Sequence, residues 1–197
     1  MPPFLMKMKR YSSFMKTTFL IACAALCLFA GRASAQKSAQ NFYAHMTAEQ
    51  ATTVKNYIGK NASLRPAQVS DCKNKFGLNS LRQSAGKSAH PYYAVADFNQ
   101  DKIKDFSMVL YDAKAKATER FTILIFNGAK SGAYKLAHKT SGADLRQGGI
   151  WTYGVSLDKK KTTVTVGEYE TDDCFWIEWN GKKYVAHDCE ELEENAK

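Results

Sequence analysis

From residue 92 onward, short apolar segments alternate with clusters of turn-forming residues, and this alternation restricts the fold more than any other feature. The apolar segments form successive pairs, at 92–97 with 106–111, 120–126 with 133–139, 150–157 with 162–167, and 174–179 with 183–187. Asn180-Gly181 separates the last pair, and this dipeptide is strongly preferred in two-residue hairpin turns. The pattern predicts an antiparallel β-meander of about eight strands.

The segment before the first predicted strand has signals for helices. Thr47 and Gln50 have the spacing of a capping box, and apolar residues then recur at helical intervals as far as Gly59. Residues 66–76, which begin with proline and are followed by glycine, are predicted to form a second short helix. Residues 78–91 are small, polar and basic, which predicts a loop. One or two short helices before an antiparallel meander make the expected fold class α+β.

The residue patterns of some predicted strands also indicate how deeply those strands are buried. Residues 121–126 are apolar on both faces, which predicts a central strand. Residues 163–166 alternate threonine with valine, which predicts a half-exposed strand. Four aromatic residues near the end of the chain either line a binding face or form core and cross-strand pairs, and we favour the second interpretation: Phe175, Trp176, Trp179 and Tyr184.

Residues 1–35 have the features of a secretory signal peptide. A basic region precedes an apolar core at 17–30, and Ala33-Ser34-Ala35 fits the small-residue cleavage rule, with the cut after Ala35. Met15 begins a stretch that would itself be a compact signal peptide, and it is our candidate for the true start. In an alternative interpretation, Cys23 ends a lipobox and carries a lipid, although the apolar core before it would then be short.

The remaining sequence divides into a polar leader at 36–46, a single α+β domain at 47–189 and an acidic tail at 190–197. The full chain has a net charge of +9, but residues 1–35 hold five basic and no acidic residues, so 36–197 carry +4. This small excess does not favour a nucleic-acid partner, and no second apolar run predicts a membrane span. We expect a periplasmic or secreted protein whose partner is an unknown protein or a component of the cell envelope.

Three cysteines follow the predicted cleavage site, namely Cys72, Cys174 and Cys189. Export implies an oxidising compartment in which disulfides form and persist. Three single pairings are possible, and Cys174 with Cys189 is the pair we expect because these residues flank the predicted hairpin.

A short acidic segment lies between the first two predicted strands. Its oxygen-bearing groups occupy positions 1, 3, 5, 7 and 9 of a loop, as Asp97, Asn99, Asp101, the carbonyl of Ile103, and Asp105. Ca²⁺ binds six to eight oxygen ligands from a tight loop, and this spacing is typical of such sites. Lys102 occupies position 6, where glycine is usual, and its charge and conformational cost are expected to weaken the site. The alternative is an ordinary Asx-rich turn without a metal.

The stretch from Ala96 to Phe106 resembles the acidic core of FG-GAP and VCBS-type repeats. The resemblance covers about fifteen residues, at 95–109, and implies that the aspartates and the asparagine bind Ca²⁺ between two strands. A β-propeller needs several such repeats, and this sequence has one copy. The resemblance therefore implies a single blade-like unit in a small domain.

Recognisable enzyme motifs are absent from the sequence. The leading hypothesis is a small exported binding or interaction protein with a structural calcium site. One alternative is an exported hydrolase in which Asp97, Asp101 and Asp105 hold a catalytic metal and His90 acts as a base. Another is a periplasmic inhibitor or immunity-type protein, which the small size and the hairpins permit.

Overall fold

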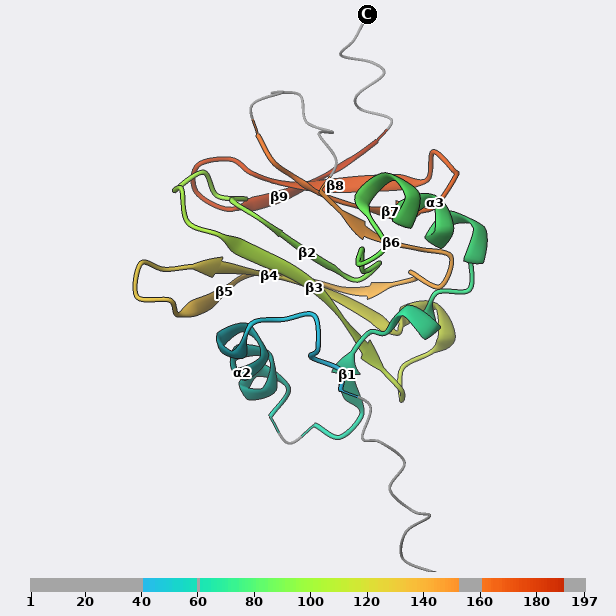
Figure 1. Ribbon diagram of the computed structural model, residues 1–197, viewed down its shortest axis with the longest axis horizontal. Coiled ribbons are helices and arrows are strands. Elements are labelled where there is room, and N and C mark those ends of the chain that lie inside the picture. Colours follow the sequence, from blue (N-terminus) through green and yellow to red (C-terminus); the bar gives the residue numbers. More distant parts are fainter. Residues whose placement is uncertain (1–40, 60, 153–160, 190–197) are drawn as a thin grey trace, which may run out of the picture. The chain divides into compact units, whose positions relative to one another are not determined.

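The computed structural model describes residues 41–59, 61–152 and 161–189 (Figure 1). The described residues from Phe42 to Cys189 belong to one compact unit. The predicted signal peptide, the leader up to residue 40 and the acidic tail therefore lie outside the described residues. Within the described ranges, no helix has the length and apolar character needed to cross a membrane.

One sheet is built around the long strands in the middle of the chain. Strands β3, β4 and β5 are antiparallel neighbours, and β2 and β1 both pair with β3 along the edge that β4 does not use. The bounds of this sheet are β1 Leu64–Pro66, β2 Tyr93–Ala96, β3 Asp105–Asp112, β4 Phe121–Gly128 and β5 Tyr134–Ala143.

The last four described strands form a second antiparallel sheet in the order β6-β7-β8-β9. Their bounds are β6 Gly148–Trp151, β7 Val164–Glu168, β8 Cys174–Trp179 and β9 Tyr184–Asp188. The α+β class and the antiparallel sheets therefore agree with the sequence prediction. The described residues contain nine strands in two sheets, whereas the sequence predicts one meander of about eight. The chain leaves the first sheet after β5, and the buried side chain of Leu145 enters the core between the two sheets.

Helix α2, at Ala48–Ile58, begins with the predicted capping box. The Gln50 N–H donates to Thr47 Oγ1 at 3.3 Å, and the Thr47 N–H donates to Gln50 Oε1 at 2.9 Å. Gly59 ends the helix with a φ of 58°, a conformation that glycine adopts at little cost. Val54 of this helix packs against the first sheet, together with Tyr43 and Met46 from the segment before it.

The predicted helix at 66–76 is wrong, and the predicted loop at 78–91 is correct only from Gly86 onward. Pro66 belongs to β1 and a short 3₁₀ turn occupies Val69–Asp71, while the second helix, α3, spans Lys75–Ala85. Asn74 caps α3, because its side-chain oxygen accepts a hydrogen bond from the Gly77 N–H at 2.8 Å. The sequence does not predict this helix, because few of its side chains are apolar and the helical periodicity is weak. Only Gly77 and Leu78 of α3 are buried.

Strand β4 is covered on both faces, as its sequence predicts. Phe121, Ile123 and Ile125 face the core between the two sheets, which includes Ile150, Val164 and Ile177 from the second sheet. The alternate residues Leu124 and Phe126 belong to a second cluster, beneath α2. Figure 1 shows α2 against the face of the first sheet that is turned away from the second sheet.

The prediction that residues 163–166 are half exposed is wrong, because all four are buried. Strand β7 is a central strand of its sheet, between β6 and β8, and its Val164 and Val166 belong to the core between the two sheets. The preferred interpretation of the four late aromatic residues agrees with the structure. Trp176 is buried and stacks on His187, and Trp179 contacts Tyr184 edge to face with ring centroids 5.1 Å apart.

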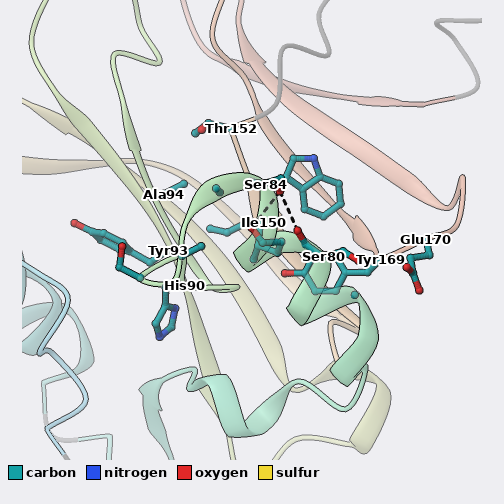
Figure 2. A pocket seen from close by; sticks show the side chains of 15 residues that line it. Ser80, Ser84, His90, Tyr93, Ala94, Ile150, Thr152, Tyr169 and Glu170 are labelled. Atoms are coloured by element: carbon teal, nitrogen blue, oxygen red, sulfur yellow. Dashed lines mark hydrogen bonds between the residues drawn. The ribbon is translucent and has the colours of Figure 1, made fainter.

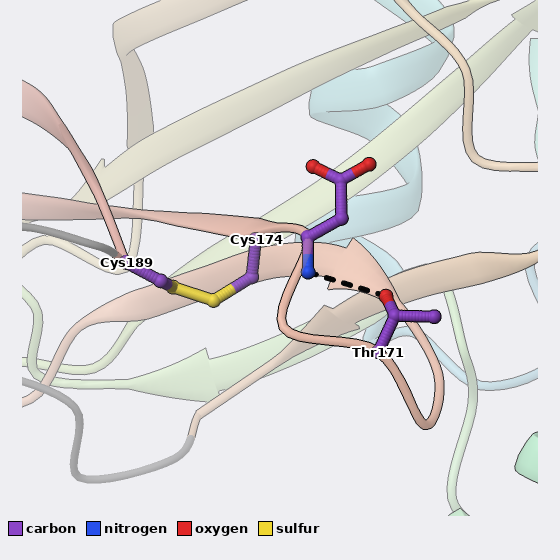
Figure 3. Close-up of a disulfide and its surroundings, with 4 residues drawn as sticks. Thr171, Cys174 and Cys189 are labelled. Carbon is purple, nitrogen blue, oxygen red and sulfur yellow. Dashed lines mark hydrogen bonds between the residues drawn. A yellow bond between two sulfur atoms is a disulfide. The ribbon is translucent and has the colours of Figure 1, made fainter.

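A disulfide joins Cys174 to Cys189, at the start of β8 and the end of β9, as the sequence predicts (Figure 3). The Cα atoms are 5.5 Å apart, and the Cys189 N–H donates to the Cys174 carbonyl at 3.1 Å. Cys72 is free and buried. The cross-link therefore closes the open end of the last hairpin.

Replacing both Cys174 and Cys189 by serine should lower the free energy of unfolding by about 3 kcal/mol. Without the cross-link, the unfolded chain regains the conformational entropy that closing a loop of this length removes. Urea denaturation with tryptophan fluorescence measures the change. Dithiothreitol should destabilise the wild type by a similar amount and leave the double variant unaffected. Equal stability of the oxidised and reduced wild type would contradict the prediction.

Candidate functional site

The acidic turn between β2 and β3 brings together three of the predicted metal ligands. The Asp97 carboxylate accepts hydrogen bonds from the N–H groups of Asp101 at 3.0 Å and Lys102 at 2.8 Å. Asn99 Oδ1 accepts from the same Asp101 N–H at 3.1 Å, and Asn99 Nδ2 donates to Asp101 Oδ2 at 3.0 Å. The side chains of Asp97 and Asn99 therefore share the Asp101 N–H, and the Asp101 carboxylate is hydrogen-bonded to the Asn99 amide.

Asp105 has a different role from these three. It is fully buried, and its Oδ2 accepts the N–H groups of Phe98 at 2.9 Å and Asn99 at 3.1 Å. Its Oδ1 accepts the Gly128 N–H at 2.8 Å, at the far end of β4. Burial raises the pKa of this carboxyl group, and the three amide donors partly oppose that effect. Asp105 therefore joins the acidic turn to the β4–β5 connection.

Residue 102 adopts the backbone conformation that position 6 of a calcium loop requires. Lys102 has a φ of 68°, and Gln100 has a φ of 64°, so both lie in the left-handed region. The Ile103 N–H donates to Asp101 Oδ1 at 2.8 Å. Among the described residues, no three or more His, Cys, Asp or Glu side chains form a group that could hold a metal ion.

A pocket of about 600 Å³ lies beside α3, where that helix approaches β2 of the first sheet and β6 of the second (Figure 2). Helix α3 supplies small residues to its wall, including Ser80, Ser84 and Ala85. The other residues that line it come from the segments at 88–94, 150–152 and 169–170. Sequence analysis misses this site because residues that are far apart in the chain form it, and no local motif marks them.

Tyr169 and Trp151 form an aromatic part of the pocket wall. The Tyr169 ring centroid lies 5.7 Å from that of Trp151. Helix α3 approaches Tyr169 closely at Gly77, where an added Cβ would lie 2.2 Å from the Tyr169 Cβ. The Tyr169 hydroxyl is buried and finds no hydrogen-bond partner among the residues that the structure describes, and burial raises the pKa of this phenol. The two rings give the pocket an aromatic surface.

His90 lies at the other side of the pocket. Its ring stacks on His45 with centroids 4.1 Å apart, and its Nδ1 accepts the Tyr92 N–H at 3.2 Å. Burial lowers the pKa of His90 to about 3, and the neighbouring His45 and Arg82 contribute in the same direction. Burial also lowers the pKa of His45. Both imidazoles are therefore neutral at pH 7.

Acidification from pH 7 to pH 5 should destabilise the protein by about 1–2 kcal/mol through His90. The unfolded chain takes up a proton below its ordinary pKa of about 6.5, whereas the folded state resists protonation, so stability falls as the pH drops through this window. Urea denaturation at both pH values measures the loss. The His90→Gln variant should show a smaller loss, and an unchanged difference would contradict the prediction.

The hydrolase alternative requires His90 to lie beside the acidic turn, and the structure does not place it there. His90 precedes β2 and Asp97 follows it, so the two residues lie at opposite ends of an extended strand. Comparisons of this chain with models of protein families, with curated proteins and with solved structures identify no match.

Proposed function

We propose that this chain is a small exported binding protein that takes a small organic ligand in the pocket beside α3. The observation that supports this proposal is the pocket itself, whose volume of about 600 Å³ is in the range typical of small-molecule sites. Its lining is more apolar than polar and combines aromatic and aliphatic side chains with several hydroxyl groups and one carboxylate, and small-molecule sites are usually mainly apolar with some polar groups.

The elements around this pocket are held firmly. The Ile150 N–H donates to the Pro91 carbonyl at 2.7 Å, which ties β6 to the segment before β2. The Tyr169 N–H donates to the Gln147 carbonyl at 3.3 Å, and Asn74 Nδ2 donates to the Tyr169 carbonyl at 3.4 Å. A site held by such contacts needs little ordering when a ligand binds, which favours affinity.

A variant that fills the pocket tests this function. Ser84 lines the pocket and its hydroxyl bonds only to helix carbonyls, so Ser84→Leu should occupy the space without disturbing α3. Gln83→Leu is the matched control, because Gln83 is exposed on the same helix and does not line the pocket. We expect 2-naphthylmethanol to bind the wild type and Gln83→Leu in calorimetric titrations. Binding to Ser84→Leu that equals the wild type would overturn the proposal.

We propose further that the acidic turn binds Ca²⁺ weakly and that the ion fixes the turn between β2 and β3. The side-chain oxygens that gather at Asp97, Asn99 and Asp101 fit a hard cation, and the Ile103 carbonyl would add a ligand. Asp105 is the exception, because it is fully buried, whereas Asp97 and Asn99 are only partly buried and Asp101 is exposed. Ca²⁺ should raise the melting temperature in a concentration-dependent way, and Asp101→Ala should abolish this shift. An unchanged melt in Ca²⁺ and in EDTA would refute the proposal.

Lys102→Gly should stabilise the protein by about 1 kcal/mol in EDTA, since glycine adopts the observed positive φ without strain. It should also increase the Ca²⁺-dependent shift, because a positive charge next to the turn is removed. Thermal melting with and without Ca²⁺ measures both effects. Lys104→Gly serves as the control: Lys104 is not among the residues with positive φ, so glycine there should give no gain in EDTA. Destabilisation by Lys102→Gly would contradict the strain argument.

A further inference from the structure

The side chains that line the pocket beside α3 carry charge of one sign. Glu170 supplies the one charged side chain among the described residues that line the pocket, and no lysine or arginine is among them. His90 also lines the pocket, but it is neutral at pH 7 because burial lowers its pKa to about 3. The charge that the lining residues present to a ligand is therefore negative.

The carboxylate is next to the aromatic wall in both sequence and space. Glu170 follows Tyr169 directly, and Figure 2 shows the two side chains on the same side of the pocket. Glu170 has a φ of 68°, a left-handed conformation that costs a non-glycine residue about 1 kcal/mol. The turn after β7 thus holds a carboxylate at the edge of a surface formed by Tyr169 and Trp151.

We propose that the pocket binds a small planar aromatic molecule that carries a cationic amine. The aromatic ring of the ligand packs against Trp151 and Tyr169, and its ammonium group lies toward Glu170. This inference rests on the proposed function, because it specifies the ligand class of the same pocket.

Two physical effects favour a cation in this pocket. An ammonium group near the faces of aromatic rings is attracted by their negative electrostatic potential. A carboxylate beside those rings adds a charge-assisted hydrogen bond, and it repels an anionic ligand of the same shape. A neutral ligand would gain only the burial of its apolar surface.

Three probes with the same ring system but different charge test the proposal. The cation is 2-naphthylmethylammonium, the neutral analogue is 2-naphthylmethanol, and the anion is 2-naphthoate. Isothermal titration with the purified protein at pH 7 and low salt gives the Kd of each. We expect the cation to bind at least tenfold more tightly than the neutral analogue, and the anion to bind more weakly than both.

Two variants assign this selectivity to Glu170. Glu170→Gln keeps the shape of the side chain and should reduce the preference for the cation to less than threefold, while the neutral probe keeps its wild-type Kd. Glu119→Gln is the matched control, because Glu119 is exposed and does not line this pocket. It should preserve the preference.

The outcomes separate the ligand class from the proposed function. If the cation and the neutral probe bind equally well, or if Glu170→Gln leaves the preference intact, the charge selectivity is refuted and the pocket remains a binding site. If no probe binds, or if Ser84→Leu binds the probes like the wild type, the proposed function fails together with this inference.

Discussion

Replacement of Asp105 by alanine is expected to lower the free energy of unfolding by about 3–5 kcal/mol. The carboxylate is fully buried and accepts three backbone N–H groups, from Phe98, Asn99 and Gly128. Its removal would leave these amides without an acceptor, and each unpaired buried donor costs about 1–3 kcal/mol before water relieves part of the loss. Urea denaturation in EDTA measures the effect without a contribution from metal binding.

Two controls make the result for Asp105 specific. Asp101 is exposed in the same turn, so Asp101→Ala in EDTA should cost about 1 kcal/mol or less. Asp105→Asn retains one acceptor oxygen but places an NH₂ group against an N–H donor, so its loss should fall between those of the two alanine variants. A loss below about 1 kcal/mol for Asp105→Ala would show that the carboxylate does not support the turn.

Gly149→Val should destabilise the protein by about 4 kcal/mol or more. A Cβ atom at Gly149 would lie 2.2 Å from the Pro91 carbonyl oxygen and 2.5 Å from the Tyr169 hydroxyl. The carbonyl cannot move aside easily, since it accepts the Ile150 N–H in the contact that ties β6 to the segment before β2. The substitution should therefore separate these segments and open the pocket.

Circular dichroism during thermal melting, together with titration of 2-naphthylmethanol, measures both consequences at Gly149. Gly132→Ala is the control, because a Cβ there meets no atom within 4 Å and only its positive φ of 82° opposes the change. That variant should lose about 1 kcal/mol and keep its affinity for the probe. Wild-type stability of Gly149→Val would show that the close approach to Pro91 is not needed.

The sequence predicts those parts of the fold that depend on local patterns. The capping box of α2, the strand pairs after residue 92 and the pairing of Cys174 with Cys189 all follow from short-range signals. Helix α3 does not, because it buries only a narrow face and the rest of it is polar. The division into two sheets also escapes prediction, since the same hairpins could have continued as one meander.

The two candidate sites also differ in how far local patterns in the sequence predict them. The contacts among Asp97, Asn99 and Asp101 lie within a few residues, so local spacing is enough to bring these side chains together. The acceptor role of Asp105 depends on Gly128, which is 23 residues away. The pocket depends on contacts of still longer range, between α3 and the residues around β6 and β7. Such contacts leave no periodic signal in the sequence.

The position of β4 has a consequence for how the chain reaches its folded state. This strand contributes alternate residues to the core between the sheets and to the cluster beneath α2, and it pairs with β3 and β5, its neighbours in the chain. Its pairings close short loops, which cost little chain entropy. The β3–β4–β5 segment is thus suited to form early, as a template on which α2 and the second sheet condense. The amides of β4 should then exchange with solvent only when the whole domain unfolds.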